Sequence, residues 1–366
     1  MNSLAEIVRD EITRLGVMPW ARFMDLALYH PQHGYYEIKG RVGRKGDYFT
    51  SVSVGSLFGE LLAFWISEKL KSIPNEVQVI EAGANEGQMA LDILNWLQKN
   101  RPNIYRRVKY VILEPSLTRR QWQGEMLDAH GSKVRWMSDW QEIPPASVTG
   151  VVLSNELLDA FPVEIWRWDA TQHRWHEFGV TYQGGRLVWV STLSAEPYPK
   201  SLELFTSSLG AVLPHGYQRE LCPAAVSWWH QASSRLAEGW LLTFDYGGSE
   251  EDFWMADRSQ GSLRGYRKHQ AANVLEADSG EVDLTASVNF TSILSIGEDV
   301  GLITEFYDRQ QIFLMEIVQR WLEAGFELAA NQTRALATLT RPELLGTKFK
   351  AILQHQPASN NSAAKL

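Results

Sequence analysis

The sequence predicts a doubly wound α/β fold with a mainly parallel sheet, and three observations support this prediction. From residue 77 onward, short apolar segments alternate with helical patterns, as in a series of βαβ units. The turn at residues 81–87 joins one apolar segment directly to a helix, a connection typical of ligand-binding α/β sheets. The 366 residues are 45% apolar, so the chain can bury a large core.

The N-terminal segments are predicted first. Apolar residues recur at helical spacing over residues 4–15, between Ser3 as a cap and Gly16 as a stop, which predicts an amphipathic helix. Residues 20–55 are rich in Gly, Pro, Tyr and His, which predicts mostly loop with short helical pieces. A second strong helical pattern covers residues 57–70.

The strands follow from short apolar runs. Five of them predict the main sheet: residues 77–82, 108–113, 134–137, 150–154 and 240–244. An insertion between the last two contains three more runs, which the linking residues predict to be antiparallel: 164–169, 175–180 and 187–190. Near the end come apolar runs at residues 302–307 and 311–314 and a helix over residues 316–325.

These elements divide the chain into parts. We expect residues 1–74 to form a helical and loop lid and residues 75–350 to form the core. An insertion at residues 163–236 interrupts that core. We expect residues 351–366, which are polar from Gln354 onward, to form a disordered tail.

Composition excludes several classes of protein. A net charge of −8 provides no basic field for a phosphate backbone, so nucleic acid is not an expected partner. The single Cys222 rules out an intramolecular disulfide, and the acidic N-terminus shows no export signal. The apolar run at residues 61–66 is far shorter than the roughly 20 residues that cross a bilayer, so we expect no membrane span. We expect a cytoplasmic protein, or one of the mitochondrial matrix if the source is eukaryotic.

A cofactor site is predicted where the strand at residues 77–82 ends. The turn contains Gly83, Asn85 and Gly87, which permit positive φ and a close backbone approach, and the following helix offers free N–H donors. The next strand ends at Glu114, where a carboxylate can accept both hydroxyls of a ribose. The loop and the acid together predict a nucleotide-like ligand.

The charge of this turn favours one kind of ligand. Glu81 and Glu86 would repel a pyrophosphate but suit the cationic sulfonium and amino group of S-adenosylmethionine. A nicotinamide or flavin dinucleotide site is the alternative, although it prefers the pattern Gly-x-Gly-x-x-Gly. An α/β turn without any ligand is the other alternative. His30 and His33 have no acid or Cys cluster nearby, so we expect loop packing there and no metal.

Two further strand ends contribute candidate residues. Asp139 and Trp140 follow the third strand and could address the amino group and the face of an adenine, or could instead be a capping acid and a core ring. Asn155, Glu156 and Asp159 follow the fourth strand, beside the expected methyl group. Two carboxylates can hold a guanidinium in a planar fork, so Glu156 and Asp159 are the catalytic candidates. The alternative is that Asn155 and Asp159 cap a helix that begins near Glu156.

Several motifs together resemble the MidA family of class I methyltransferases, which includes mitochondrial factors for respiratory complex I assembly. They occur in the same order along most of the chain, at residues 23–36, 46–51, 81–87, 155–163, 245–247, 261–269 and 283–285. The resemblance implies a seven-stranded sheet and S-adenosylmethionine bound at Glu81, Gly83 and Glu114, with S-adenosylhomocysteine as the product. It also implies a protein arginine as the methyl acceptor.

The same resemblance implies that residues 46–51 close over the donor, which adds four cofactor candidates: Asp47, Tyr48, Thr50 and Ser51. The chain departs from the family at Ala84 and Asn85, where a Pro and a Gly are usual. Asn can adopt the left-handed conformation of a Gly, so we expect donor binding to be retained. The departure leaves open a second hypothesis, a degenerate methyltransferase fold that serves as an assembly factor. The oligomeric state stays open, a homodimer included.

Overall fold

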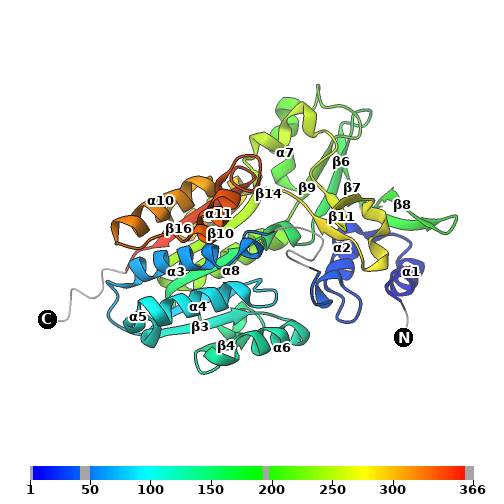
Figure 1. The fold of residues 1–366 in the computed structure, drawn as a ribbon. Helices are drawn as coiled ribbons and strands as arrows, with labels where there is room; N and C mark the ends of the chain where they lie inside the picture. Colours follow the sequence, from blue (N-terminus) through cyan, green and yellow to red (C-terminus); the bar gives the residue numbers. More distant parts are fainter. Residues whose placement is uncertain (1–2, 42–49, 193–197, 359–366) are drawn as a thin grey trace. The chain divides into compact units, whose positions relative to one another are not determined.

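The computed structural model describes residues 3–41, 50–192 and 198–358 (Figure 1). Contacts between residues divide the chain into two compact units. The larger unit comprises the described residues of Val42–Leu158, Val226–Gly247 and Ser292–Leu366. The smaller unit comprises those of Met1–Arg41, Asp159–Ala225 and Gly248–Thr291.

The larger unit is built on one seven-stranded path of a twisted sheet. Its strands are β2 (Val77–Ala82), β3 (Val108–Leu113), β4 (Val134–Met137), β5 (Val148–Asn155), β10 (Leu236–Gly248), β15 (Ile303–Arg309) and β16 (Phe349–Gln356). They lie in the order β15-β16-β10-β5-β2-β3-β4. The five strands from β10 to β4 are parallel, and β16 is antiparallel to both of its neighbours. The order reverses between β2 and β5, and ligands of open α/β sheets bind at such a switch point.

Helices cover both faces of this sheet. They are α3 (Leu57–Leu70), α4 (Gln88–Asn100), α5 (Pro102–Arg107), α6 (Leu117–Met126), α8 (Pro223–Arg235), α9 (Phe290–Asp299), α10 (Gln310–Glu323) and α11 (Ala330–Thr340). Figure 1 shows α3 in blue, and it packs against both α4 and α10. Leu353 of β16 shares one core cluster with residues of these three helices. The next residue, Gln354, points to the other face, where its Oε1 accepts a 2.8 Å hydrogen bond from Trp229 of α8. The predicted doubly wound architecture is therefore confirmed.

The smaller unit contains the antiparallel insertion. Its helices are α1 (Leu4–Leu15), α2 (Trp20–Tyr29) and α7 (Lys200–Leu209). Its strands are β1 (Met18–Pro19), β6 (Glu164–Asp169), β7 (Arg174–Gln183), β8 (Arg186–Ser191), β9 (Gln218–Leu221), β11 (Arg264–Arg267), β12 (Gln270–Ala272), β13 (Asp283–Thr285) and β14 (Val288–Asn289). One sheet has the order β1-β7-β6-β9, with β8 on β7, and a second has the order β12-β11-β13. Every pairing within these two sheets is antiparallel.

Most predicted elements are observed, and the first helix shows why. Ser3 accepts a hydrogen bond from the backbone of Glu6 while the Glu6 side chain accepts one from the backbone of Ser3, a reciprocal capping box. Gly16 ends the helix with φ of 79°. The predicted loop at residues 20–55 instead begins with helix α2. Its apolar face, which includes Trp20, Phe23 and Ala27, is fully buried.

Near the end of the chain, the predicted helix begins earlier than expected, and the expectation of a tail from residue 351 is wrong. The apolar run at residues 311–314 lies in α10, because Phe313, Leu314 and Ile317 form one buried helical face. Residues 351–356 do not form the expected tail, because they belong to β16, which lies between β10 and β15.

The expected lid at residues 1–74 is divided between the two units. Residues 1–41 group with the insertion, whereas α3 belongs to the larger unit. The insertion at residues 163–236 is divided in the same way, because its last part, from Val226, belongs to the larger unit. A lid function for the N-terminal region stays a prediction.

Candidate functional site

The turn after β2 has the backbone conformation that the sequence predicts. Gly83, Asn85 and Gly87 have φ of 73°, 47° and 94°, so all three are left-handed. A Cβ at Gly83 would lie 2.9 Å from the Leu157 side chain. Gly87 is the N-cap of α4, and within the described chain no side chain caps this terminus. Asn85 thus adopts the conformation expected of the residue that replaces a Gly, and the turn keeps its shape.

An acid is buried directly behind this turn. Glu81 is 1% exposed, and its carboxylate accepts a hydrogen bond from the hydroxyl of Tyr110 on β3. Burial raises the pKa of Glu81 to about 7. Asp92 on α4 is also buried, and burial raises its pKa to about 6. A cation bound at the turn would favour the charged forms of both acids.

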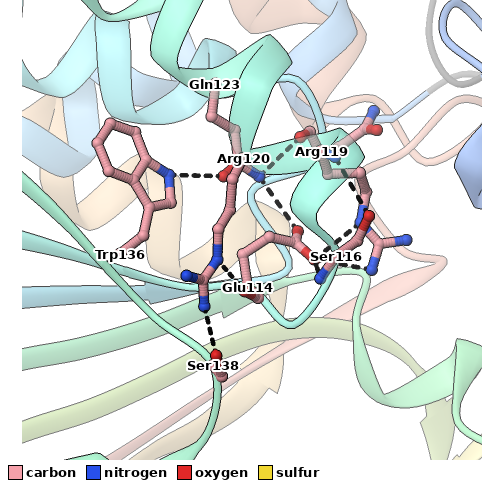
Figure 2. Close-up of polar contacts among 8 residues, drawn as sticks. Glu114, Ser116, Arg119, Arg120, Gln123, Trp136 and Ser138 are labelled. Carbon is pink, nitrogen blue, oxygen red and sulfur yellow. Dashed lines mark hydrogen bonds and ion pairs between the residues drawn. The ribbon is translucent and has the colours of Figure 1, made fainter.

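Glu114 stands at the carboxyl end of β3 and is held by three neighbours (Figure 2). Its Oε1 accepts hydrogen bonds from the backbone N–H of Ser116 at 2.9 Å and from Arg119 Nε at 2.9 Å, and Arg119 Nη2 lies 2.8 Å away. Its Oε2 accepts a 3.1 Å bond from Gln123 Nε2. Because a carboxylate has about four acceptor positions, Oε2 has room for a ligand hydroxyl beside the one donor seen among the described residues.

The residues after β4 are placed as a cap and a core ring. Asp139 is exposed, and its carboxylate accepts a 2.6 Å hydrogen bond from the backbone of Gln141. Trp140 is 3% exposed and packs edge-on against Trp228 of α8 with ring centroids 5.5 Å apart. This arrangement is the structural alternative for the pair, and contact of either residue with an adenine stays a prediction.

The acidic turn after β5 is pinned to the neighbouring strand. Glu156 has φ of 53°, and its N–H donates a 2.8 Å hydrogen bond to the carbonyl of Phe244 on β10. The next two backbone N–H groups, of Leu157 and Leu158, donate to Oδ2 of Asp245 at 3.1 and 2.8 Å. An α-helix beginning near Glu156 is not formed, because the turn continues only as a 3₁₀ helix at Leu158–Ala160.

Asp245 is a residue that the sequence reasoning missed as a separate contributor. It is fully buried at the carboxyl end of β10, directly after Phe244, which pairs with Asn155. The available signal was its position, because an acid at the end of a predicted parallel strand lies at the ligand-binding edge of the sheet.

Asn155, Glu156 and Ser51, three residues that were candidates from the sequence, lie together. Glu156 Oε1 accepts hydrogen bonds from Asn155 Nδ2 at 2.9 Å and from the Ser51 backbone at 3.0 Å. Ser51 is fully buried, with its hydroxyl 3.0 Å from Gln310 Oε1. Thr50 precedes it and is 7% exposed. The other two candidates of this segment, Asp47 and Tyr48, lie outside the described residues.

Asp159 belongs to the smaller unit. Its carboxylate accepts a 2.8 Å hydrogen bond from the Thr285 hydroxyl, and its carbonyl accepts a 2.9 Å bond from the backbone of Ala286. Burial raises the pKa of Asp159 to about 6. Joint action of Asp159 with Glu156 stays a prediction.

The larger unit's residues fit a cationic nucleoside donor. The Asn155 Oδ1 atom is buried and has no hydrogen-bond partner among the described residues, so it could accept from a ligand amino group. Glu81 and Asp92 supply negative charge near the turn, and Glu114 supplies acceptors for a ribose. In the described part of the chain, no group of three or more His, Cys, Asp or Glu side chains is arranged to hold a metal. Nor is any described helix long and apolar enough to span a bilayer.

Known proteins share both the sequence pattern and the fold. The protein arginine methyltransferase NDUFAF7 homologue of Drosophila melanogaster is 26% identical over 95% of this chain and 84% of its own length. Human NDUFAF7, also named a mitochondrial protein arginine methyltransferase, is 25% identical over 94% of this chain and 82% of its own. A Burkholderia thailandensis protein crystallised with S-adenosyl-homocysteine is 26% identical, with a TM-score of 0.81 over 99% of this chain and 94% of that one.

A family model described as "Putative S-adenosyl-L-methionine-dependent methyltransferase" matches residues 61–307. These residues include β2 to β5 and the turns after them, and so they contain Glu81, Glu114 and Glu156. The match covers well over half of the chain. The chain therefore belongs to this family of S-adenosyl-L-methionine-dependent methyltransferases.

Proposed function

We propose that this methyltransferase acts on the side chain of a protein arginine, with Glu156 as the residue that orients the acceptor. One observation carries the proposal: Glu156 stands in a left-handed turn at the carboxyl end of β5, with its Oε1 fixed by the Ser51 backbone and the Asn155 amide. The relatives named protein arginine methyltransferases support the choice of acceptor.

The chemistry suits a fixed carboxylate. When bound, S-adenosylmethionine supplies a methyl group on a sulfonium. Transfer to arginine forms a nitrogen–carbon bond as the carbon–sulfur bond breaks, and the nitrogen then loses a proton. A carboxylate that binds two N–H groups of the guanidinium keeps the group planar and fixes the direction of the reacting nitrogen. Orientation of this kind supplies much of the acceleration in a two-substrate displacement.

The role of Asp159 is a second part of the proposal. Its pKa, which burial raises to about 6, leaves it mostly charged at pH 7 and able to take up a proton. We propose that Asp159 is the second acidic residue that handles the acceptor. Replacement of Asp159 by Asn should therefore lower the affinity for the acceptor and leave the affinity for the donor unchanged.

The test uses labelled donor. Purified protein is incubated with S-adenosyl-L-methionine carrying a labelled methyl group and with a host lysate, and the labelled residue is identified by mass spectrometry. We expect methylarginine in a protein. Glu156→Gln keeps the shape of the side chain but removes its charge, and it should slow transfer by about 100-fold or more. The exposed Glu343→Gln is the matched control and should transfer at the unaltered rate.

Two outcomes would refute the proposal. Label on a lysine or on a small molecule would exclude arginine as the acceptor. Undiminished arginine labelling by Glu156→Gln would remove Glu156 from the mechanism. The names of the relatives place those proteins in mitochondria. The location of this chain, in the cytoplasm or in a mitochondrial matrix, and its assembly as a homodimer stay predictions.

A further inference from the structure

We propose that Gln123 is a positioning residue for the methyl donor, because it links the turn after β2 to the acid after β3 through one buried amide. The side chain is fully buried in the middle of α6. Its Nε2 donates to the carbonyl of Asn85 at 2.8 Å and to Oε2 of Glu114 at 3.1 Å. The inference rests on donor binding at these two places.

The orientation of the amide is fixed by a third residue. Trp136 on β4 donates its indole N–H to Gln123 Oε1 at 2.8 Å (Figure 2). An indole nitrogen is only a donor, so it must face the amide oxygen. The NH2 group is then directed toward Asn85 and Glu114, which both present oxygen atoms. Each of these three bonds would be lost if the amide rotated by 180°, because the oxygens of Asn85 and Glu114 only accept and the indole N–H only donates.

Gln123 joins the Asn85 carbonyl and the Glu114 carboxylate, which lie far apart in the sequence and are not held together by a short stretch of chain. The turn follows β2 and leads into α4, whereas Glu114 follows β3 and precedes α6. The backbone of α6 also approaches the turn closely, since a Cβ added at Gly87 would lie 3.5 Å from the Gln123 Cα. The strand pairing ends at Ala82 and Leu113, and the NH2 group adds a direct link beyond it between the carbonyl of Asn85 and the carboxylate of Glu114.

Arg119 and Gln123 bind different oxygen atoms of the Glu114 carboxylate. Arg119 and the Ser116 backbone hold Oε1, whereas Gln123 is the described side chain that holds Oε2. Oε2 is the oxygen with room for a ribose hydroxyl. Loss of the Gln123 amide would leave this oxygen free to move, even though the buried ion pair with Arg119 keeps the side chain in place. The interaction with the ribose should therefore weaken more than the rest of donor binding.

The test measures the dissociation constants of S-adenosylhomocysteine and of its 2′-deoxy analogue by isothermal titration calorimetry. Gln123→Met keeps the length of the side chain and its helix propensity but removes both polar ends. We expect this variant to bind S-adenosylhomocysteine about tenfold more weakly, because the buried partners of Gln123 are left unpaired. The 2′-deoxy analogue should lose less, so the preference for the natural ribose should fall.

Gln121→Met is the matched control, because Gln121 is an exposed residue of the same helix. The dissociation constants of both ligands should stay within about twofold of those of the unaltered protein. A residue that only stabilises the fold would weaken the two ligands by the same factor. Equal weakening, or no weakening, by Gln123→Met would therefore overturn the inference. Absence of binding by the unaltered protein would refute donor binding itself, whereas failure to methylate arginine with binding intact would refute only the proposed acceptor.

A second variant keeps the inference testable if Gln123→Met does not fold. Trp136→Phe keeps an aromatic ring and removes the N–H that orients the amide. We expect a smaller fall in the preference for the natural ribose, in the same direction. An unchanged preference in folded Trp136→Phe would count against the inference, and melting curves establish that each variant is folded.

Discussion

The carboxylate of Asp245 accepts a 2.8 Å hydrogen bond from the backbone N–H of Leu158, which lies on the turn that carries Glu156. A second N–H, of Leu157, reaches the same oxygen at 3.1 Å, and the N–H of Tyr246 reaches the other at 2.9 Å. Asp245 is fully buried. The end of β10 thus fixes the turn that follows β5.

The first prediction concerns this contact. Asp245→Ala should lower the free energy of unfolding by about 3 kcal/mol, because buried N–H groups lose a charged acceptor. Urea denaturation measures the change, and Asp128→Ala, which removes an exposed carboxylate, should cost less than about 0.5 kcal/mol. A small loss with Asp245→Ala would mean that the turn holds its shape without this residue.

The second prediction concerns the pH dependence of donor affinity. Burial raises the pKa of Glu81 to about 7, so the free protein is largely protonated there below this pH. A cationic donor favours the carboxylate, and its affinity should therefore increase as the pH rises through 7 and then level off. Titrations from pH 5.5 to 8.5 measure this, and Glu81→Gln should flatten the profile. Asp92→Asn, which removes the group with a pKa of about 6, should leave the rise near pH 7 in place.

The same shift has a consequence for stability. The folded pKa of Glu81 lies above the ordinary value of 4.5, so the folded state binds more protons between these values. Stability should be highest below about pH 4.5 for this group and should fall as the pH rises through 7. Glu81→Gln should remove this part of the slope in urea unfolding at several pH values. A slope that stays the same in the variant would contradict the assignment.

The third prediction compares two glycines. Gly83 has φ of 73° and would place a Cβ 2.9 Å from the Leu157 side chain, so Gly83→Ala should destabilise the protein by about 1 to 2 kcal/mol. Gly124 lies inside α6 with no atom within 4 Å of an added Cβ. Gly124→Ala should stabilise by about 0.5 to 1 kcal/mol. Thermal unfolding of the two variants should move in opposite directions.

The fourth prediction concerns the unpaired acceptor at the site. Asn155 Oδ1 is buried without a partner among the described residues, while its amide nitrogen donates to Glu156. Asn155→Ala should weaken S-adenosylmethionine by about tenfold but should change the melting temperature of the free protein little, because the lost bond is offset by the loss of an unsatisfied atom. A variant that melts much earlier yet binds the donor normally would show that Asn155 has only a structural role.

Local patterns in the sequence predict much of this fold. The strands β2, β3, β4 and β6 have the predicted bounds, because each is an apolar run between clear breaks. The left-handed turn at Gly83, Asn85 and Gly87 follows from residue types alone. These features depend on neighbours in the sequence, which a pattern can reveal.

Features that depend on distant partners were not predictable. Gln354 and His355 indicate a solvent-exposed tail by residue type. In the structure, Gln354 bonds to Trp229, Leu294 and Thr304, and the ring of His355 stacks 4.9 Å from that of Trp240. The polar groups are thus satisfied by residues at least 50 positions away in the sequence, and strand β16 forms where a tail was expected.

The position of β16 has a consequence for synthesis of the protein. Among the strands of the described chain, β15 pairs with β16 alone, and β16 also pairs along one side of β10. A ribosome releases residues 349–356 well after both of those strands. Until then the nascent chain presents two unpaired strand edges, one of them on β10, the strand that contains Asp245. A chain truncated before residue 349 would keep these edges unpaired, and unpaired strand edges favour aggregation.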